Sequence, residues 1–241
     1  MQASTSLNRS RHERHHTSVT AQVQETVRSN ERFESVESRW PPVIALLLIL
    51  GLDALLPGRF RVAPSWVPYV VVFGTIASML GFMAFRTQLW RNIERVVIGG
   101  FVLVTGALML LSLSQLISSI IGRAGEISGL TLLASAIAIW VSNIALFAFI
   151  YWAFDGRGPE ARAAGASSEW YFPQQQIPER FSDWRPLFFD YLYLAYETST
   201  AFSSTDDGPL TRQAKFLMMS QSAISLITLV IVAARAINVL K

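Results

Sequence analysis

The sequence predicts an all-α fold: a polytopic membrane helix bundle of five transmembrane helices plus one helix that is re-entrant, interfacial or a sixth span. Charged residues make up only 15% of the 241 residues and apolar residues 51%, whereas soluble domains carry about 25% charge. The apolar residues also gather in blocks close to the length that crosses a bilayer. The chain has no cysteine, which excludes disulfides, a thiolate nucleophile and a Cys-ligated metal.

Residues 1–39 are expected to form a disordered polar tail. They are rich in Ser, Thr, Arg and Glu and lack the apolar stretch of a secretory signal. All three histidines lie in this segment. His12 and His16 have the spacing of a helical metal pair, but their polar surroundings favour a solvated tail over a metal site.

Residues 40–154 are predicted to form a four-helix transmembrane region. Its apolar blocks lie at residues 41–57, 66–85, 96–121 and 130–154. Prolines at both ends of the first block are typical of a helix start and a helix end. In the second block, Gly74 and Ser78 form a small-xxx-small step that lets a neighbouring helix come close.

The distribution of arginine predicts the orientation. The 86–95 loop carries three arginines, the 57–65 loop two and the 122–129 loop one. Because positive charge marks the cytoplasmic side of short loops, we expect a multi-pass protein of the cell membrane with a cytoplasmic N-terminus. Residues 155–185, a polar connecting loop, then also lie on the cytoplasmic side.

Residues 186–241 are predicted to contain a pore-like helix, an acidic turn and the last transmembrane helix. Residues 187–204 are apolar enough to enter a membrane and too polar to be assigned as a span. On a helix, Asp190, Tyr193 and Glu197 share one face. This segment is therefore a sixth span with its acids toward the bundle, a re-entrant half-helix or an interfacial amphipathic helix. The C-terminus lies on the cytoplasmic side only in the first case.

A polar stripe runs along the last predicted helix. Its members, spaced to share one face, are Gln221, Ser225, Thr228 and Arg235. In the preceding span, Asn143 lies within an aromatic stripe. Such stripes are either packing seams held by interhelical hydrogen bonds or the lining of a permeation path. Arg235 either reaches toward the interface or pairs with an acid of the 187–204 segment, Asp190 or Glu197.

The C-terminal part resembles a family of predicted bacterial integral membrane proteins of unknown function. The resemblance rests on "DYLY" (190–193), "STD" (204–206), the cations Arg212 and Lys215, and the "ARAIN" ending (234–238). The upstream "VSNIALFAFIYWAF" also resembles that family's aromatic helix, although a histidine often found there is missing. The resemblance covers roughly half of the chain and implies an integral membrane protein without implying an activity.

A more distant likeness is to the pore helix and inner helix of two-span potassium channels. It lies in the order of parts: an aromatic helix, a polar turn and a long final helix. Potassium selectivity requires carbonyl rings from a T-x-G-[YF]-G segment. The aligned residues 200–208 contain a single glycine in an acidic turn, and the predicted orientation is opposite to that of such channels. A potassium filter is therefore not expected.

The predicted function is a channel-like or transport protein for cations with a degenerate filter region. No phosphate loop, nucleophile elbow, zinc motif or dinucleotide fingerprint occurs, so we predict no enzyme activity, catalytic residue, metal site or cofactor. The predicted partners are the lipid bilayer, further copies of the chain and cations, and not nucleic acid. The alternative is a structural or regulatory membrane protein without permeation activity. The pore or binding candidates are Asp190, Tyr193, Glu197, Thr200, Asp206, Asp207, Gln221, Ser225, Thr228, Arg235 and Asn143.

Overall fold

The computed structural model describes residues 37–85, 87–122, 128–182, 184–200 and 207–239. The described chain is mostly helical, which confirms the all-α class. The tail predicted for residues 1–39 lies outside the described residues except for its last three positions. Asp206 of the predicted acidic turn also lies outside them.

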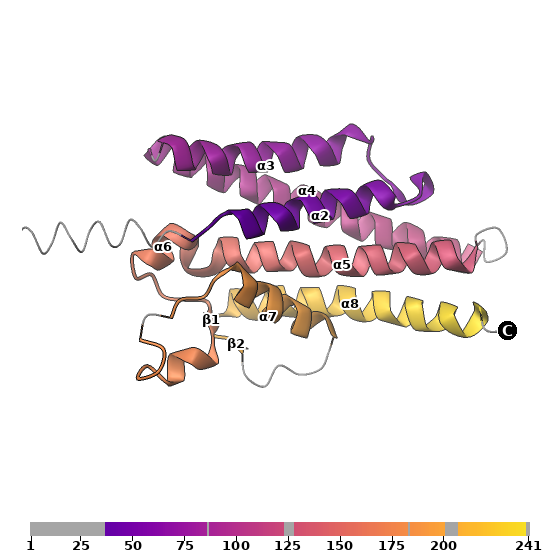
Figure 1. The fold of residues 1–241 in the computed structure, drawn as a ribbon. Coiled ribbons are helices and arrows are strands. Elements are labelled where there is room, and N and C mark those ends of the chain that lie inside the picture. Colours follow the sequence, from indigo (N-terminus) through magenta and orange to yellow (C-terminus); the bar gives the residue numbers. More distant parts are fainter. Residues whose placement is uncertain (1–36, 86, 123–127, 183, 201–206, 240–241) are drawn as a thin grey trace, which may run out of the picture.

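Five long helices lie side by side in one bundle (Figure 1). They are α2 (Trp40–Leu55), α3 (Trp66–Phe85), α4 (Gln88–Gly122), α5 (Gly129–Phe154) and α8 (Arg212–Val239). A shorter helix, α7 (Phe188–Thr200), packs beside α5 and α8. The remaining elements are short: η1 (Gly58–Phe60), η2 (Asp155–Arg157), α6 (Pro159–Ala163), β1 (Trp170–Tyr171), η3 (Pro173–Gln176) and β2 (Gly208–Pro209).

Within the described ranges, four helices are long and apolar enough to cross a membrane, as judged by length and composition: α3, α4, α5 and α8. Helix α2 is also apolar but has 16 residues, roughly 24 Å at about 1.5 Å per residue. These helices expose large apolar side chains such as Val70, Leu103 and Val230. An outward apolar surface of this kind suits a lipid environment.

The structure corrects the predicted loop at residues 86–95. Helix α4 begins at Gln88, several residues before the predicted block, and the Thr87 hydroxyl accepts a hydrogen bond from the Trp90 amide (3.4 Å). Arg and Glu are good helix formers, so the helix continues through Arg91, Glu94 and Arg95 although these residues are too polar for a membrane signal. The charged residues therefore form the first turns of α4.

Helix α5 forms the centre of the bundle. Every residue from 143 to 152 is buried, and α5 packs against α2, α4, α7 and α8. A helix that is apolar all round is typically buried on all sides. The ring of Phe149 contacts those of Phe101 and Trp152, with centroids 5.2 and 5.8 Å apart. Helices α2, α4, α7 and α8 are therefore positioned by α5, whereas α3 packs against α4 and α2.

Helix α7 starts at the same end of the bundle as α8. Its first residue, Phe188, contacts Trp152 near the end of α5, with ring centroids 6.2 Å apart. In its last turn, Ser199 accepts a hydrogen bond from Gln221 (2.7 Å), in the first half of α8. The helix has 13 residues, roughly 20 Å of rise against a hydrocarbon core of about 30 Å. Helix α7 is therefore shorter than this layer and runs from the end where α8 begins (Figure 1).

The two-stranded pairing of β1 with β2 closes this end of the bundle. The strands are antiparallel, with Trp170 opposite Pro209 and Tyr171 opposite Gly208. Thr211 caps the start of α8, because its hydroxyl accepts a hydrogen bond from the Ala214 amide (3.2 Å). Residues 155–185, predicted as a connecting loop, therefore contain short elements that pack against the start of α8.

We expect the two chain ends to lie on opposite sides of the membrane. If α7 does not cross, the five long helices give an odd number of crossings. Reporter proteins whose signal depends on the compartment, fused before Met1 and after Lys241, measure this directly. A cytoplasmic signal from both fusions would contradict the half-helix arrangement of α7.

Candidate functional site

The polar stripe of α8 lies in the protein interior, between α5 and α7. Gln221 is fully buried. Its Nε2 donates to the Ala195 carbonyl and to the Ser199 hydroxyl, both at 2.7 Å. Its Oε1 accepts from the Tyr151 hydroxyl (2.5 Å). Both donors of this side-chain amide and its oxygen therefore join α8 to the two neighbouring helices.

Asn143 of α5 adds to these interhelical hydrogen bonds of Gln221, and together they form the seam between α5, α7 and α8. Its Nδ2 donates to the Ser225 hydroxyl (2.7 Å) and to the Gln221 carbonyl (3.4 Å). Its Oδ1 is buried and has no hydrogen-bond partner among the described residues. Thr228 is also buried and donates to the Ile224 carbonyl of its own helix (2.8 Å). The three described polar residues of the stripe thus face protein and not an open channel within one chain.

Arg235 lies near the end of α8, in its last two turns. It belongs to α8, but its side chain is outside the described residues. Its backbone lies about fourteen residues beyond Gln221, roughly 21 Å at about 1.5 Å per residue, whereas the last turn of α7 contacts α8 at Gln221. Because the Arg235 side chain is outside the described residues, its pairing with Asp190 or Glu197 stays a prediction.

The acidic face of α7 points away from the bundle. Buried Tyr191, Leu194 and Ala195 form the inner face, while Tyr193 on the other side is 48% exposed. Glu197 is half-buried, and its Oε2 has no hydrogen-bond partner within the described part of the chain. The predicted grouping of Asp190, Tyr193 and Glu197 on one helix face is confirmed, and that face is the outer one.

The remaining candidates lie at the two ends of this face. The Asp190 carboxylate accepts from the Leu187 amide (2.7 Å) and so caps the start of α7. Thr200 donates to the carbonyl of Glu197 (3.1 Å) in the last turn. Asp207 lies just before β2 and is 9% exposed. Asp206 is outside the described residues, so the predicted acid pair of the turn is seen only in part.

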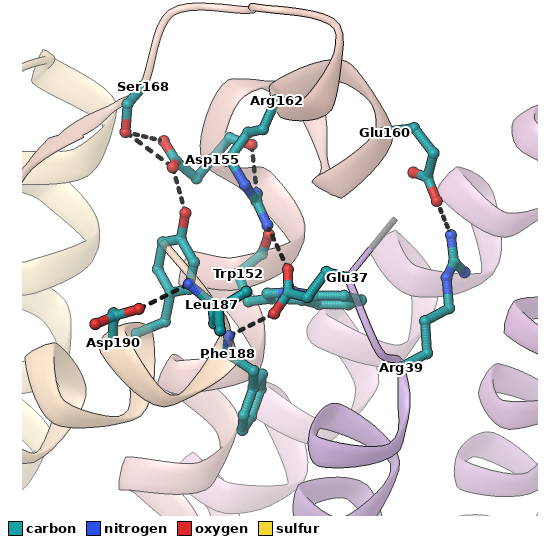
Figure 2. Close-up of polar contacts among 11 residues, drawn as sticks. Glu37, Arg39, Trp152, Asp155, Glu160, Arg162, Ser168, Leu187, Phe188 and Asp190 are labelled. Carbon is teal, nitrogen blue, oxygen red and sulfur yellow. Dashed lines mark hydrogen bonds and ion pairs between the residues drawn. The ribbon is translucent and has the colours of Figure 1, made fainter. Parts of the chain in front are cut away.

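Sequence reasoning missed a buried polar network at the end of α5 (Figure 2). Its centre is the carboxylate of Asp155, which is fully buried. The Ser168 hydroxyl lies 2.9 and 2.8 Å from its two oxygens, and the Tyr191 hydroxyl donates to Oδ2 (2.5 Å). Asp155 therefore joins α5, the segment before β1 and α7 at one point.

Arg162 of α6 supplies the positive charge of this network. Its Nη1 donates to the carbonyl of Trp152 in the last turn of α5 (2.7 Å) and to that of Asp155 just after it (2.8 Å). Its Nη2 lies 3.4 Å from the Glu37 carboxylate, and its guanidinium carbon lies 5.0 Å from the centre of the Tyr191 ring. One side chain thus caps α5 and contacts α7.

Glu37 joins the network from the residues before α2. Its carboxylate accepts from the Trp152 indole (2.8 Å) and from the Phe188 amide (2.5 Å). Burial raises the pKa of Glu37 above its ordinary value, and this outweighs the lowering by the Trp152 hydrogen bond and the Arg162 charge. The entry to α2 and the start of α7 are therefore held by one carboxylate (Figure 2).

Backbone conformation places Arg162 beneath the end of α5. Gly156, Arg157 and Gly158 all have positive φ, at 55°, 68° and 104°. A Cβ on Gly156 would lie 2.8 Å from Cγ of Arg162, so this position needs glycine for both space and conformation. The "DGRGP" stretch after an apolar helix was the sequence signal that could have indicated this reversal. Nothing in the sequence indicated which side chains the reversal would bring together.

The polar groups at the centre of this network bond to one another and hold the neighbouring segments together. The Asp155 oxygens are already occupied by donors from two neighbouring segments: Ser168 and the Glu169 amide before β1, and Tyr191 of α7. No group of three or more His, Asp or Glu suited to a metal ion occurs among the described residues. Comparison with protein-family models gives no match, and comparisons with curated proteins and solved structures give none either. The family resemblance of the C-terminal part therefore stays a prediction.

We expect Gln221→Leu to destabilise the bundle. It leaves the Tyr151 and Ser199 hydroxyls and the Ala195 carbonyl without their partner, and each interhelical hydrogen bond contributes around 0.6 kcal/mol in a membrane protein. The loss should be about 1–2 kcal/mol, measured as a lower unfolding midpoint of the purified protein in detergent. Gln213→Leu, at an exposed position of the same helix, is the matched control. Equal stability of the two variants would contradict the seam.

We expect the stability of the protein to fall as the pH rises above the ordinary Glu37 pKa of about 4.5. Because the folded pKa is raised, the folded state holds the Glu37 proton more tightly than the unfolded state, and this advantage disappears as the pH passes through the raised value. Glu37→Gln should remove this contribution, so the difference in unfolding midpoint between variant and wild type should change with pH. Glu179→Gln, at an exposed carboxylate, should show no such dependence. If the unfolding midpoint of Glu37→Gln differed from that of the wild type by the same amount at every pH, the pH dependence would not come from Glu37.

Proposed function

We propose that the protein is a multi-pass membrane protein with five spanning helices and one re-entrant half-helix, α7. Several copies assemble so that the outer faces of α7 line a path for cations. The N-terminus lies in the cytoplasm, as the arginine distribution predicts. No chemical reaction and no cofactor are part of this proposal.

The acidic outer face of α7 carries the proposal. A charged side chain facing lipid at the centre of a bilayer costs roughly 2.5–3.5 kcal/mol on insertion scales. Glu197 lies in the deeper half of α7, beyond Asp190, and its side chain is partly exposed. Contact with a second copy or with water avoids this cost, whereas contact with lipid does not. Assembly around α7 is therefore the arrangement that this face favours.

The order and direction of α5, α7 and α8 support the same function. A long helix ends, a half-helix enters from that end beside it, and a second long helix then begins there (Figure 1). This is the order of parts in a channel pore module. The glycine-rich potassium filter is missing from the sequence, so we propose that carboxylates, with Glu197 foremost, attract the cation. The path would then select for charge and not for potassium.

The second candidate is a structural or regulatory membrane protein without permeation. It is favoured by the seam between α5, α7 and α8, in which Gln221 bonds to Tyr151, Ala195 and Ser199. A polar stripe whose groups are bonded within one chain needs no aqueous path to explain it. On this alternative, the outer face of α7 would only hold copies or partner proteins together.

Cation flux into proteoliposomes separates the two candidates. We expect the wild-type protein to conduct monovalent cations and Glu197→Gln to lower the flux by on the order of tenfold, the loss expected when about 1.4 kcal/mol of attraction is removed. Glu179→Gln makes the same charge change on an exposed loop and should conduct like the wild type. An assembled wild-type protein that passes no cation would favour the second candidate.

A further inference from the structure

A cleft lined by arginines opens between α4, α5 and α6. Its basic residues are Arg91 and Arg95 of α4 and Arg157 of the turn after α5. Two acids, Glu94 and Glu160, also line it. None of its lining residues belongs to α7, so it is separate from the acidic face of that helix.

Both acids of the cleft are already paired with Arg39. This buried arginine, 4% exposed, forms salt bridges with Glu94 and with Glu160, and Figure 2 shows its contact with Glu160. None of the three cleft arginines forms a salt bridge with an acid in the described part of the chain. The cleft therefore has more positive charge than its own acids neutralise.

Two of the cleft arginines have features that suit a bound anion: a donor without an acceptor in Arg91 and an uncommon backbone conformation in Arg157. The Nε atom of Arg91 is buried without a hydrogen-bond partner among the described residues, while its guanidinium lies 5.8 Å from the centre of the Phe82 ring. Arg157 has φ 68°, a left-handed conformation that is uncommon for a residue with a side chain and that is often found at functional sites. A bound anion would supply acceptors for these donors.

The position of the cleft indicates which anion it would meet. Ile98, Trp152 and Ala153 give it an apolar floor, and it lies where the apolar part of α4 gives way to its charged first turns. In a membrane this level is occupied by lipid head groups. Basic pockets between transmembrane helices on the cytoplasmic side are typical binding places for anionic head groups.

We propose that this cleft binds the phosphate group of an anionic phospholipid. Arg91 and Arg95 hold the phosphate through charge-assisted hydrogen bonds, Arg157 closes over it from the turn, and the apolar floor contacts the glycerol and acyl part. Arg39 keeps Glu94 and Glu160 from repelling the ligand. Because this end of α5 also carries the network that positions α7, bound lipid would stabilise the same end of the bundle. This site does not depend on cation permeation.

Native mass spectrometry of the purified protein tests the proposal. The protein is titrated with phosphatidylglycerol, with phosphatidylcholine and with glycerol phosphate, and bound ligand is counted. We expect tight binding of phosphatidylglycerol alone, weakened on the order of tenfold or more in the double variant Arg95→Gln, Arg157→Gly. Both positions are exposed, and glycine suits the backbone at 157, so the variant should fold. Arg180→Gln, at an exposed arginine of the 155–185 segment, is the matched control.

Three results would overturn the proposal. Equal binding of phosphatidylglycerol and phosphatidylcholine would mean that charge is not recognised. An equal loss in Arg180→Gln would mean that the lipid responds to surface charge in general. Binding of glycerol phosphate as tight as that of the lipid would indicate a site for a soluble phosphate compound. The variants' elution in size-exclusion chromatography distinguishes each of these from loss of folding.

Discussion

The buried carboxylate of Asp155 is the contact on which the rest of this structure depends. It lies directly after the central helix α5, where the chain must reverse and where several carbonyls lose their helical partners. Hydroxyls of Ser168 and Tyr191 satisfy its oxygens, and Arg162 satisfies the carbonyls next to it. A buried charge with its partners removed is strongly destabilising. The end of α5, the connecting segment and the start of α7 therefore form one unit.

This unit determines where α7 lies. The half-helix is held at its start by the Tyr191 contact with Asp155 and at its end by the Ser199 contact with Gln221. These two contacts lie on its inner face, so the face with Asp190, Tyr193 and Glu197 is turned outward. The same two contacts that stabilise a single chain thus present an acidic surface to whatever surrounds it. The proposed assembly and cation path follow from this orientation.

The predictions from sequence were most successful where one property repeats along a helix. The apolar blocks predicted α3, α5 and α8, and the period of the α8 stripe correctly placed Gln221, Ser225 and Thr228 on one face. The start of α4 was missed because Arg91, Glu94 and Arg95 are as compatible with a helix as with a loop. The direction of the α8 stripe was left open, since the period of a stripe identifies a face and not the neighbour opposite it. The pairing predicted for Arg235 depends on how far α7 and α8 are shifted along each other. No local pattern in the sequence contains that information.

The sequence by itself determined the all-α class, the apolar helices and the acidic face of α7, because these depend on composition and on a period of 3.6 residues. Only the tertiary structure decided that α7 starts at the end of the bundle where α8 begins. It also decided that Glu37, Arg162 and Asp155 meet around Trp152 and Tyr191, and that Arg39 frees the cleft arginines from Glu94 and Glu160. These contacts join residues far apart in the chain. Their partners are chosen by the packing of whole helices, and local sequence carries no information on that packing.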